Sequence, residues 1–365
     1  MSLVASLGGL AALHGSRLEH ATLARFARTA DADDVLDLYH RSAEPGFAAT
    51  LFQAAAQLRD RHLGTAPWWS AGVSAITPCE LEPLCTYCNF FTTKATPAAD
   101  IVAAVRAIAG LGIRHVHLSG GSRLPRGERA RGLGPQVIDL VTAIRKAVDI
   151  EIEVNVGPSL MREDVRDLKD LGVTAITSSL EVLNARLFEQ LKPGDSLQGR
   201  LQLMEFCEEA GMPIRSMMMV GIGETDQDRI DHLVYLRRYT MMKQLRLSRY
   251  MPIRNTAAGG VRCAPWLVAR LTAIARLLYP TLEIGLAAGN GTDDLPLWWM
   301  AGGGNQVLGA GASMKGRAHK SGDVDEIPVN DRVGVHNNMP GVTRVLGEMG
   351  LRATFSSPPS SVRKS

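Results

Sequence analysis

The chain has 365 residues and a formal net charge of +3, from 40 Lys and Arg against 37 Asp and Glu. At roughly 100–200 residues per domain, this length allows two domains or one large α/β barrel. The composition, 45% hydrophobic and 21% charged, is ordinary for a globular protein and excludes the disordered and fibrous classes. The small net charge predicts no nucleic acid and no membrane as the main partner.

Helices and strands follow one another in a regular order. Residues 18–62 are predicted to be helical, because Val35, Leu38 and Tyr39 recur at helical spacing. From Gly72 onward, short apolar strands alternate with amphipathic helices. The predicted strands are 72–77, 114–119, 150–156, 173–179, 213–220, 244–250, 282–288 and 305–309. The helices predicted between them include 99–110, 196–210 and 264–279.

This order predicts an α/β fold, a (β/α)8 TIM-type barrel with an N-terminal helical extension. A doubly wound open sheet is the competing architecture. We expect a helical extension over residues 1–69, the barrel over 70–315, and a C-terminal region over 316–365 with a loop, a short helix near 341–349 and a disordered tail. Residues 316–340 are interpreted as a solvated loop, with a lid over the barrel mouth as the alternative.

Several features indicate the cellular compartment. Five cysteines, an odd number, do not suit a secreted disulfide framework. The first fifteen residues are apolar but lack the basic start of a signal peptide. The uncharged run at 295–314 is interrupted by five glycines, so we expect strand and loop there rather than a membrane-spanning helix. These features predict a cytoplasmic protein.

Three of the cysteines, Cys79, Cys85 and Cys88, lie within ten residues directly after the first predicted strand. That position is the carboxyl-end face of a barrel, where catalytic groups gather. Three thiolates can hold three irons of a [4Fe–4S] cube and leave the fourth iron open for chemistry. Structural zinc, which takes four ligands, and ordinary buried thiols are the alternatives.

The cysteine loop, with the aromatic Tyr87 just before its last cysteine, resembles the radical S-adenosylmethionine (radical SAM) superfamily. Further segments after strands two, four, five and six fit the same resemblance, and all fall at one end of the predicted barrel. The cofactor-binding residues that it implies are Tyr87, Ser119, Gly120, Gly121, Glu181, Arg200, Gly221, Glu224 and Met251. Two positions depart from the superfamily pattern: Ser122 replaces the Glu of a Gly-Gly-Glu segment, and methionines replace the first half of the motif that ends at Glu224.

The resemblance implies the cofactors and the chemistry. A reduced [4Fe–4S] cluster held by Cys79, Cys85 and Cys88 cleaves S-adenosylmethionine, and the resulting 5′-deoxyadenosyl radical takes a hydrogen atom from a small-molecule substrate. Arg200 would bind the methionine carboxylate with a charge-assisted hydrogen bond. Glu181 would bind the ribose or the methionine end. An electron donor such as ferredoxin or flavodoxin is the implied partner.

The spacing of the cysteines indicates which enzymes of the superfamily the chain resembles most. Cys-x5-Cys-x2-Cys has two more residues than the usual superfamily loop, and it resembles the radical SAM enzyme of [Fe]-hydrogenase guanylylpyridinol (FeGP) cofactor biosynthesis. The alternatives are an enzyme like methylornithine synthase or the [FeFe]-hydrogenase maturase, and a non-catalytic barrel stabilised by a metal. Biotin synthase is disfavoured, because only Cys207 and Cys263 remain for a second cluster. We interpret Cys207 as a buried structural thiol and Cys263 as a spectator.

Substrate contacts are expected from polar residues at inner strand ends. The candidates are Asn155, Ser178, Arg249, Asn290 and Asn305. Their polarity predicts a small polar substrate with carboxylate or hydroxyl groups.

Overall fold

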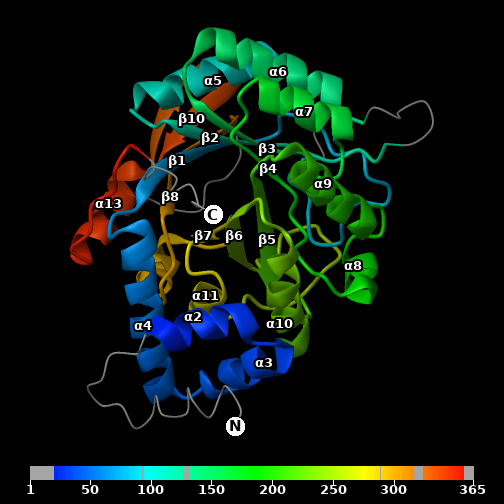
Figure 1. The fold of residues 1–365 in the computed structure, drawn as a ribbon. Coiled ribbons are helices and arrows are strands. Elements are labelled where there is room, and N and C mark those ends of the chain that lie inside the picture. Colours follow the sequence, from blue (N-terminus) through cyan, green and yellow to red (C-terminus); the bar gives the residue numbers. More distant parts are fainter. Residues whose placement is uncertain (1–19, 92–93, 126–131, 288, 316–323, 357–365) are drawn as a thin grey trace.

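The computed structural model describes residues 20–91, 94–125, 132–287, 289–315 and 324–356. Parallel strands alternate with helices that surround them (Figure 1). The strands are β1 (Trp68–Val73), β2 (His115–Ser119), β3 (Glu151–Asn155), β4 (Ala175–Thr177), β5 (Ile214–Val220), β6 (Met242–Arg249), β7 (Glu283–Leu286), β8 (Gln306–Met314), β9 (Asp325–Pro328) and β10 (Val333–Asn337).

The helices fall into an N-terminal group and a barrel group. The first comprises α2 (His20–Thr29), α3 (Ala32–Arg41) and α4 (Pro45–Leu63). The second comprises α5 (Ala98–Gly110), α6 (Gly134–Ala147), α7 (Arg162–Asp170), α8 (Ala185–Leu191), α9 (Leu197–Ala210), α10 (Asp226–Tyr235), α11 (Pro265–Leu278), α12 (Leu295–Met300) and α13 (Met339–Glu348), with short 3-10 turns at Leu236–Arg238 and Thr292–Asp294. Each helix in the described part of the chain is too short or too polar to cross a membrane.

The strand order identifies the architecture. The sheet runs β7-β6-β5-β4-β3-β2-β1-β8-β10-β9, and β1 pairs in parallel with both β2 and β8. A first strand between the second and the eighth is what a closing (β/α)8 barrel requires, whereas a doubly wound sheet reverses its strand order instead. The predicted TIM-type barrel is therefore confirmed, and the open-sheet alternative is wrong.

The barrel closes through a short seam rather than a full ladder between β7 and β8. The second edge of β8 is taken by the antiparallel strand β10, which leaves Ile284 of β7 to exchange backbone hydrogen bonds of 2.8 and 3.0 Å with Gly304. Arg59 of α4 supports this seam, because its Nη1 donates to the carbonyl oxygens of Trp299 (2.6 Å) and Gly303 (3.1 Å). The N-terminal helices thus help to close the barrel.

Those helices cover one side of the barrel from outside. Helices α2, α3 and α4 pack against α11, α3 also contacts α10, and α4 also contacts α12. In Figure 1 the blue helices lie below and to the left of the strands, next to α10 and α11. The predicted N-terminal helical extension is present as three helices rather than one continuous segment.

Three predicted elements differ from the observed ones. The first strand lies at Trp68–Val73, upstream of the predicted 72–77, and Ala75 has a φ of 60° that ends the extended backbone. The eighth strand extends to Met314, beyond its predicted end at residue 309. It includes Gly309 and Gly311, and glycine has a low propensity for strands. The solvated loop predicted over 316–340 is wrong at Asp325–Pro328 and Val333–Asn337, which form the strands β9 and β10. Residues 316–323 and the predicted disordered tail from residue 357 lie outside the described residues.

The interior of the barrel holds charged residues below its carboxyl end. Glu153 of β3 is fully buried and accepts hydrogen bonds from Arg215 of β5 (2.7 Å) and from both Nη atoms of Arg246 of β6 (2.8 Å each). Burial alone would raise the pKa of the Glu153 carboxyl, but Arg215 and Arg246 hold it well below its usual range. This network forms a polar floor under the barrel mouth.

Candidate functional site

The three clustered cysteines lie on the loop between β1 and α5, at the carboxyl end of the barrel strands. Backbone bonds shape this loop: the Cys79 amide donates to the Phe91 carbonyl (2.7 Å) and the Cys88 amide to the Cys85 carbonyl (3.3 Å). All three thiols are free and partly buried. The loop therefore presents three sulfur atoms from one short segment.

Two glycines after β2 allow the cysteine loop to lie directly against the sheet. A Cβ built on Gly120 would lie 2.1 Å from Thr77 Oγ1, and one built on Gly121 would lie 2.1 Å from the Cys79 amide nitrogen. Backbone bonds fix this approach, since the Gly121 amide donates to the Thr77 carbonyl (2.9 Å). The Ser119-Gly120-Gly121 segment thus positions Cys79, and Ser119 lies beside it at the end of β2.

The residues between Cys79 and Cys85 are held from two sides. Glu80 forms an ion pair with Arg123, whose Nε donates to Glu80 Oε2 at 2.9 Å. On the other side, a Cβ built on Gly194 would lie 2.0 Å from the Pro83 carbonyl oxygen. The lengthened part of the loop is therefore packed between the segment after β2 and the turn after α8.

Thr86, between the second cysteine and Tyr87, joins three segments. Its amide donates to the Leu191 carbonyl at the end of α8 (2.8 Å), and its carbonyl accepts from the Ala258 amide of the segment after β6 (2.7 Å). These bonds place the end of α8 and the β6 loop next to the cysteines.

An apolar cluster packs against two of the cysteines. Cys85 and Cys88 contact a group of buried side chains that comprises Tyr87, Val182, Phe188, Leu191 and Tyr250. Burial raises the pKa of the Cys85 thiol to about 12 and also raises that of Cys88. The thiols are therefore protonated at neutral pH unless a positive charge such as a metal ion replaces the proton.

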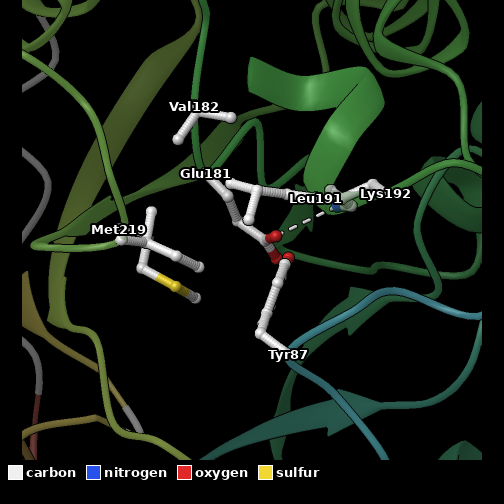
Figure 2. A pocket seen from close by; sticks show the side chains of 7 residues that line it. Tyr87, Glu181, Val182, Leu191, Lys192 and Met219 are labelled. Atoms are coloured by element: carbon white, nitrogen blue, oxygen red, sulfur yellow. Dashed lines mark ion pairs between the residues drawn. The ribbon is translucent and has the colours of Figure 1, made fainter. Parts of the chain in front are cut away.

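Four charged side chains lie in a row beside the cysteine loop, and those of Lys192, Asp195 and Arg200 are buried. Glu181 Oε2 is 3.0 Å from Lys192 Nζ, Lys192 Nζ is 3.1 Å from Asp195 Oδ2, and Asp195 Oδ2 is 2.6 Å from Arg200 Nη2. Figure 2 shows the first of these pairs, with the Tyr87 ring pointing toward the Glu181 carboxylate and Met219 of β5 across the pocket. The charges alternate, so the row is neutral as a whole.

Glu181 has an unusual backbone conformation that the sheet enforces. Its φ is 66°, a left-handed conformation that costs a non-glycine residue on the order of 1–3 kcal/mol. Two backbone bonds of 2.8 Å to Met217 and Met219 hold it against β5. Its Oε2 atom is buried and lies 3.0 Å from Lys192 Nζ, with no partner in hydrogen-bonding geometry among the described residues. The carboxylate is thus fixed beside Lys192, at the pocket that Glu181 lines with Tyr87 and Met219.

Arg200 is oriented by Asp195 and keeps free donors. Its Nε and Nη2 donate to Asp195 Oδ2 (3.0 and 2.6 Å), and its Nη1 donates to the Ser179 carbonyl (2.6 Å). Because a guanidinium has five N–H groups and three of them donate in these bonds, two remain for a further acceptor. Burial opposes the charge of Arg200, but Asp195 keeps its pKa raised. This arrangement suits an anionic ligand group.

The loop after β5 has a different construction from the predicted one. The Glu224 carboxylate accepts hydrogen bonds from the amides of Gly221 (2.7 Å) and Ile222 (2.8 Å), and Arg229 Nε lies 2.6 Å from its Oε1. Glu224 therefore shapes the Gly221 turn, which has a φ of 87°. Met251 is partly buried just after β6, and the neighbouring Tyr250 amide donates to Val220 at the end of β5 (2.8 Å).

The predicted substrate residues do not all lie together. Asn155 ends β3 on the inner face, with its Nδ2 3.5 Å from His117 Nε2. The Nδ1 atom of His117 lies 2.6 Å from Glu153 Oε1 of the polar floor. Ser178 instead donates to the Arg200 carbonyl (2.8 Å), and Arg249 binds Asp294 Oδ1 (2.9 Å). Asn290 accepts from the Ala287 amide at 3.1 Å within its own loop. Asn155 thus remains the candidate with the clearest position at the mouth.

The prediction for Asn305 is wrong. This residue precedes β8, so it lies at the amino end of the barrel, where its Nδ2 donates to the Leu63 carbonyl (2.7 Å). Asn305 is also the first residue of the predicted strand, 305–309, so its choice as a residue at the carboxyl end of that strand was mistaken. Conversely, the polar floor of Glu153, Arg215 and Arg246 was missed, although the alternation of charged and apolar residues in 150–156 indicates a strand with one polar inner face.

Comparison of the sequence with known protein families is consistent with this site. Residues 78–236 match the model of the Radical SAM superfamily. The matched segment comprises 159 of the 365 residues, so the similarity to that superfamily covers less than half of the chain. This similarity supports the expectation of a radical SAM enzyme with a [4Fe–4S] cluster and S-adenosylmethionine as its cofactors.

Individual relatives are distant. An uncharacterized protein of Methanocaldococcus jannaschii is 27% identical over 56% of this chain and 56% of its own length. Biotin synthase of Halorhodospira halophila is 27% identical over 61% of this chain and 70% of its own length. The chain thus spans little more than half of the first of these relatives. The [FeFe]-hydrogenase maturase HydG of Carboxydothermus hydrogenoformans covers 97% of this chain and 79% of its own with a TM-score of 0.75, and at 18% identity it shows the shared fold.

The residues present fit these cofactors. Three free thiols on one loop suit three irons of a cube. No three His, Cys, Asp or Glu side chains within the described ranges converge to hold a single ion, and a cube does not need that convergence because each thiolate binds a different iron. The two remaining N–H groups of Arg200 suit the carboxylate of S-adenosylmethionine, and the Glu181 carboxylate, which lines the pocket, suits its donor groups.

Proposed function

We propose that this radical SAM enzyme generates a 5′-deoxyadenosyl radical that acts on a small polar substrate, in the biosynthesis of the FeGP cofactor of [Fe]-hydrogenase. The observation that carries the proposal is the Cys79-x5-Cys85-x2-Cys88 loop. Its lengthened part is packed between Arg123 and Gly194, so the surrounding chain is adapted to the long spacing.

The chain's own residues would bind and orient the cofactors. Bound together at the cysteine loop, the cluster and S-adenosylmethionine supply one-electron chemistry. Arg200, oriented by Asp195, would bind the methionine carboxylate through its two remaining N–H groups. Glu181 would accept hydrogen bonds from the ribose hydroxyls or the methionine amino group, and Glu224 would keep the Gly221 turn in shape for the adenine side. Buried Tyr87, Val182 and Leu191 would exclude water.

The substrate would lie at the barrel mouth above the polar floor. Asn155 and the inner face of β2 supply hydrogen-bonding groups there, which supports a polar substrate. We further propose a cytoplasmic location and a low-potential electron donor of the ferredoxin or flavodoxin class.

Anaerobic reconstitution followed by EPR spectroscopy tests the proposal. The reduced protein should give a [4Fe–4S]⁺ signal that changes when S-adenosylmethionine is added, with 5′-deoxyadenosine formed. The Cys85→Ala variant should lose the cluster and all turnover, whereas Cys207→Ala, which removes a buried thiol of α9, should retain the signal. A reconstituted wild-type protein without iron or 5′-deoxyadenosine would refute the proposal.

Product analysis then tests the pathway. The enzyme should consume a pyridinol precursor and not the amino acids that a mutase like methylornithine synthase or a maturase like HydG would use. Turnover of an amino-acid substrate would retain the radical enzyme and reject the FeGP assignment.

A further inference from the structure

Lys192 is a buried cation whose environment is unusual for a lysine. Its side chain is 2% exposed, although lysine is almost never fully buried unless it is paired. The ammonium lies between the Glu181 and Asp195 carboxylates (3.0 and 3.1 Å) and 5.0 Å from the centre of the Phe188 ring. The fold thus keeps a positive charge away from water at this position.

The backbone places that charge next to the second cysteine. Lys192 follows Leu191, whose carbonyl accepts from the amide (2.8 Å) and the hydroxyl (3.2 Å) of Thr86. Thr86 is the residue directly after Cys85. Cys85 also packs against the apolar cluster that contains Phe188 and Leu191, and the Lys192 ammonium lies over the ring of the same Phe188. The ammonium and the Cys85 side chain therefore lie against the same buried cluster, where charges interact strongly.

The net charge around Lys192 changes when the cluster binds and is reduced. The row Glu181, Lys192, Asp195 and Arg200 is neutral without cofactors, but three thiolates outweigh the positive charge of an oxidised iron–sulfur core. Reduction adds one more negative charge beside the apolar cluster of Tyr87, Phe188 and Leu191. A charge in such surroundings is costly unless an opposite charge lies close to it.

We propose that Lys192 is a positioning residue that raises the reduction potential of the cluster by placing a buried ammonium beside the Cys85 thiolate. The step concerned is the transfer of one electron from a donor of the ferredoxin or flavodoxin class to the oxidised cluster, with no bond formed and no proton moved. The proposal rests on the proposed function, since it requires the cluster at Cys79, Cys85 and Cys88.

The test is an EPR-monitored redox titration without S-adenosylmethionine, with titanium(III) citrate as the reductant. For Lys192→Met we expect the ratio of reduced to oxidised cluster at a fixed potential to fall at least tenfold, which equals 59 mV for a one-electron couple. Lys192→Arg should stay close to the wild type. Lys243→Met, which removes an exposed lysine of β6, is the matched control and should not shift.

A double variant separates an electrostatic role from a structural one. Lys192→Met combined with Glu181→Gln removes one charge of each sign, so it should recover most of the shift. An unchanged potential in Lys192→Met with full iron content would overturn the proposal, and so would a double variant with a larger shift than the single one.

Loss of iron from the Lys192 variants also tests the proposal. If Lys192→Met and Lys192→Gln lose the cluster while Lys192→Arg keeps it, the cluster requires the charge, in agreement with the proposal. If Lys192→Arg loses it as well, side-chain shape rather than charge is what residue 192 supplies, and the proposal is wrong. A wild-type protein that takes up no cluster would refute the proposed function itself, whereas a normal wild-type signal with unshifted variants refutes only the role of Lys192.

Discussion

Gly194 lies against Pro83 so closely that a Cβ on residue 194 would come within 2.0 Å of the Pro83 carbonyl oxygen. The φ of Gly194 is not in the left-handed region, so the requirement for glycine is steric. The contact joins the turn that carries Lys192 and Asp195 to the lengthened part of the cysteine loop. The loop length and the glycine therefore depend on each other.

Replacement of that glycine by alanine should disturb the cysteine loop. Gly194→Ala must displace the Pro83 segment, at a cost of about 1–3 kcal/mol for overpacking, and should lower the iron content after reconstitution. Gly347→Ala is the matched control, because nothing lies within 4 Å of a Cβ at that position of α13, and alanine favours a helix over glycine. Equal iron content in the two variants would show that the loop adapts to the methyl group.

The strand–helix alternation was sufficient to predict the barrel and to place the cysteine loop after its first strand. These are local signals: Cys79, Cys85 and Cys88 lie within ten residues of one another, and apolar periodicity indicates each strand separately. The boundary errors occurred where local signals are weak, as in the glycine-rich β8. Asn305 was assigned to the barrel mouth although it begins the predicted strand and precedes the observed one, at the amino end of the barrel.

Relations between distant segments could not be predicted from periodicity. The pairing of Glu153 with Arg215 and Arg246 joins three strands, and the seam between Ile284 and Gly304 depends on β10 occupying the free edge of β8. Likewise, Glu224 was assigned to the cofactor, whereas its carboxylate binds the amides of its own loop. A sequence motif shows which residue is required but not which atom it contacts.

Arg200→Ala should weaken binding of S-adenosylmethionine by about 1.5–3 kcal/mol, the range for a hydrogen bond to a charged group. The variant also leaves Asp195 with Lys192 as its remaining cationic partner, so iron content must be measured in parallel. Arg162→Ala, which removes a half-exposed arginine paired with Glu209, is the control. Isothermal titration gives the dissociation constants, and an unchanged value for Arg200→Ala would remove this residue from the site.

Glu224→Gln should loosen the turn after β5. The amide side chain has one acceptor where the carboxylate has two, so it must turn an N–H group toward the Gly221 or the Ile222 amide and leave a donor unsatisfied. We expect a loss of about 1–3 kcal/mol in the free energy of unfolding and weaker binding of S-adenosylmethionine. Asp226→Asn changes a more exposed partner of the same Arg229 and should have a smaller effect on both quantities.

The barrel seam depends on a buried guanidinium. Arg59→Met retains the aliphatic stem but removes the donors to the Trp299 and Gly303 carbonyls, and unsatisfied buried acceptors cost about 1–3 kcal/mol each. Urea denaturation of the cluster-free protein should show a correspondingly lower free energy of unfolding. Arg61→Met, at an exposed position of the same helix, should change it by less than about 0.5 kcal/mol. Equal stability of the two variants would mean that α4 does not support the seam.

His232 should make the stability of the cluster-free protein depend on pH. Burial in α10 lowers its pKa from 6.5 to about 4, and within the described part of the chain its Nε2 has no hydrogen-bond partner. Between these values the unfolded chain binds the proton and the folded chain does not, so this contribution is fully present above pH 6.5 and is lost as the pH falls to 4. At 1.36 kcal/mol per unit the loss amounts to about 3 kcal/mol.

Replacement of His232 by leucine removes this titration. The free energy of unfolding of His232→Leu should therefore fall less than that of the wild type between pH 6.5 and 4, by up to about 3 kcal/mol. His40→Leu replaces an exposed histidine on α3 and should leave the wild-type slope in place. Because carboxylates titrate in all three proteins, the measured quantity is the difference between their pH profiles, and parallel profiles for His232→Leu and the wild type would show that His232 is protonated in the folded state.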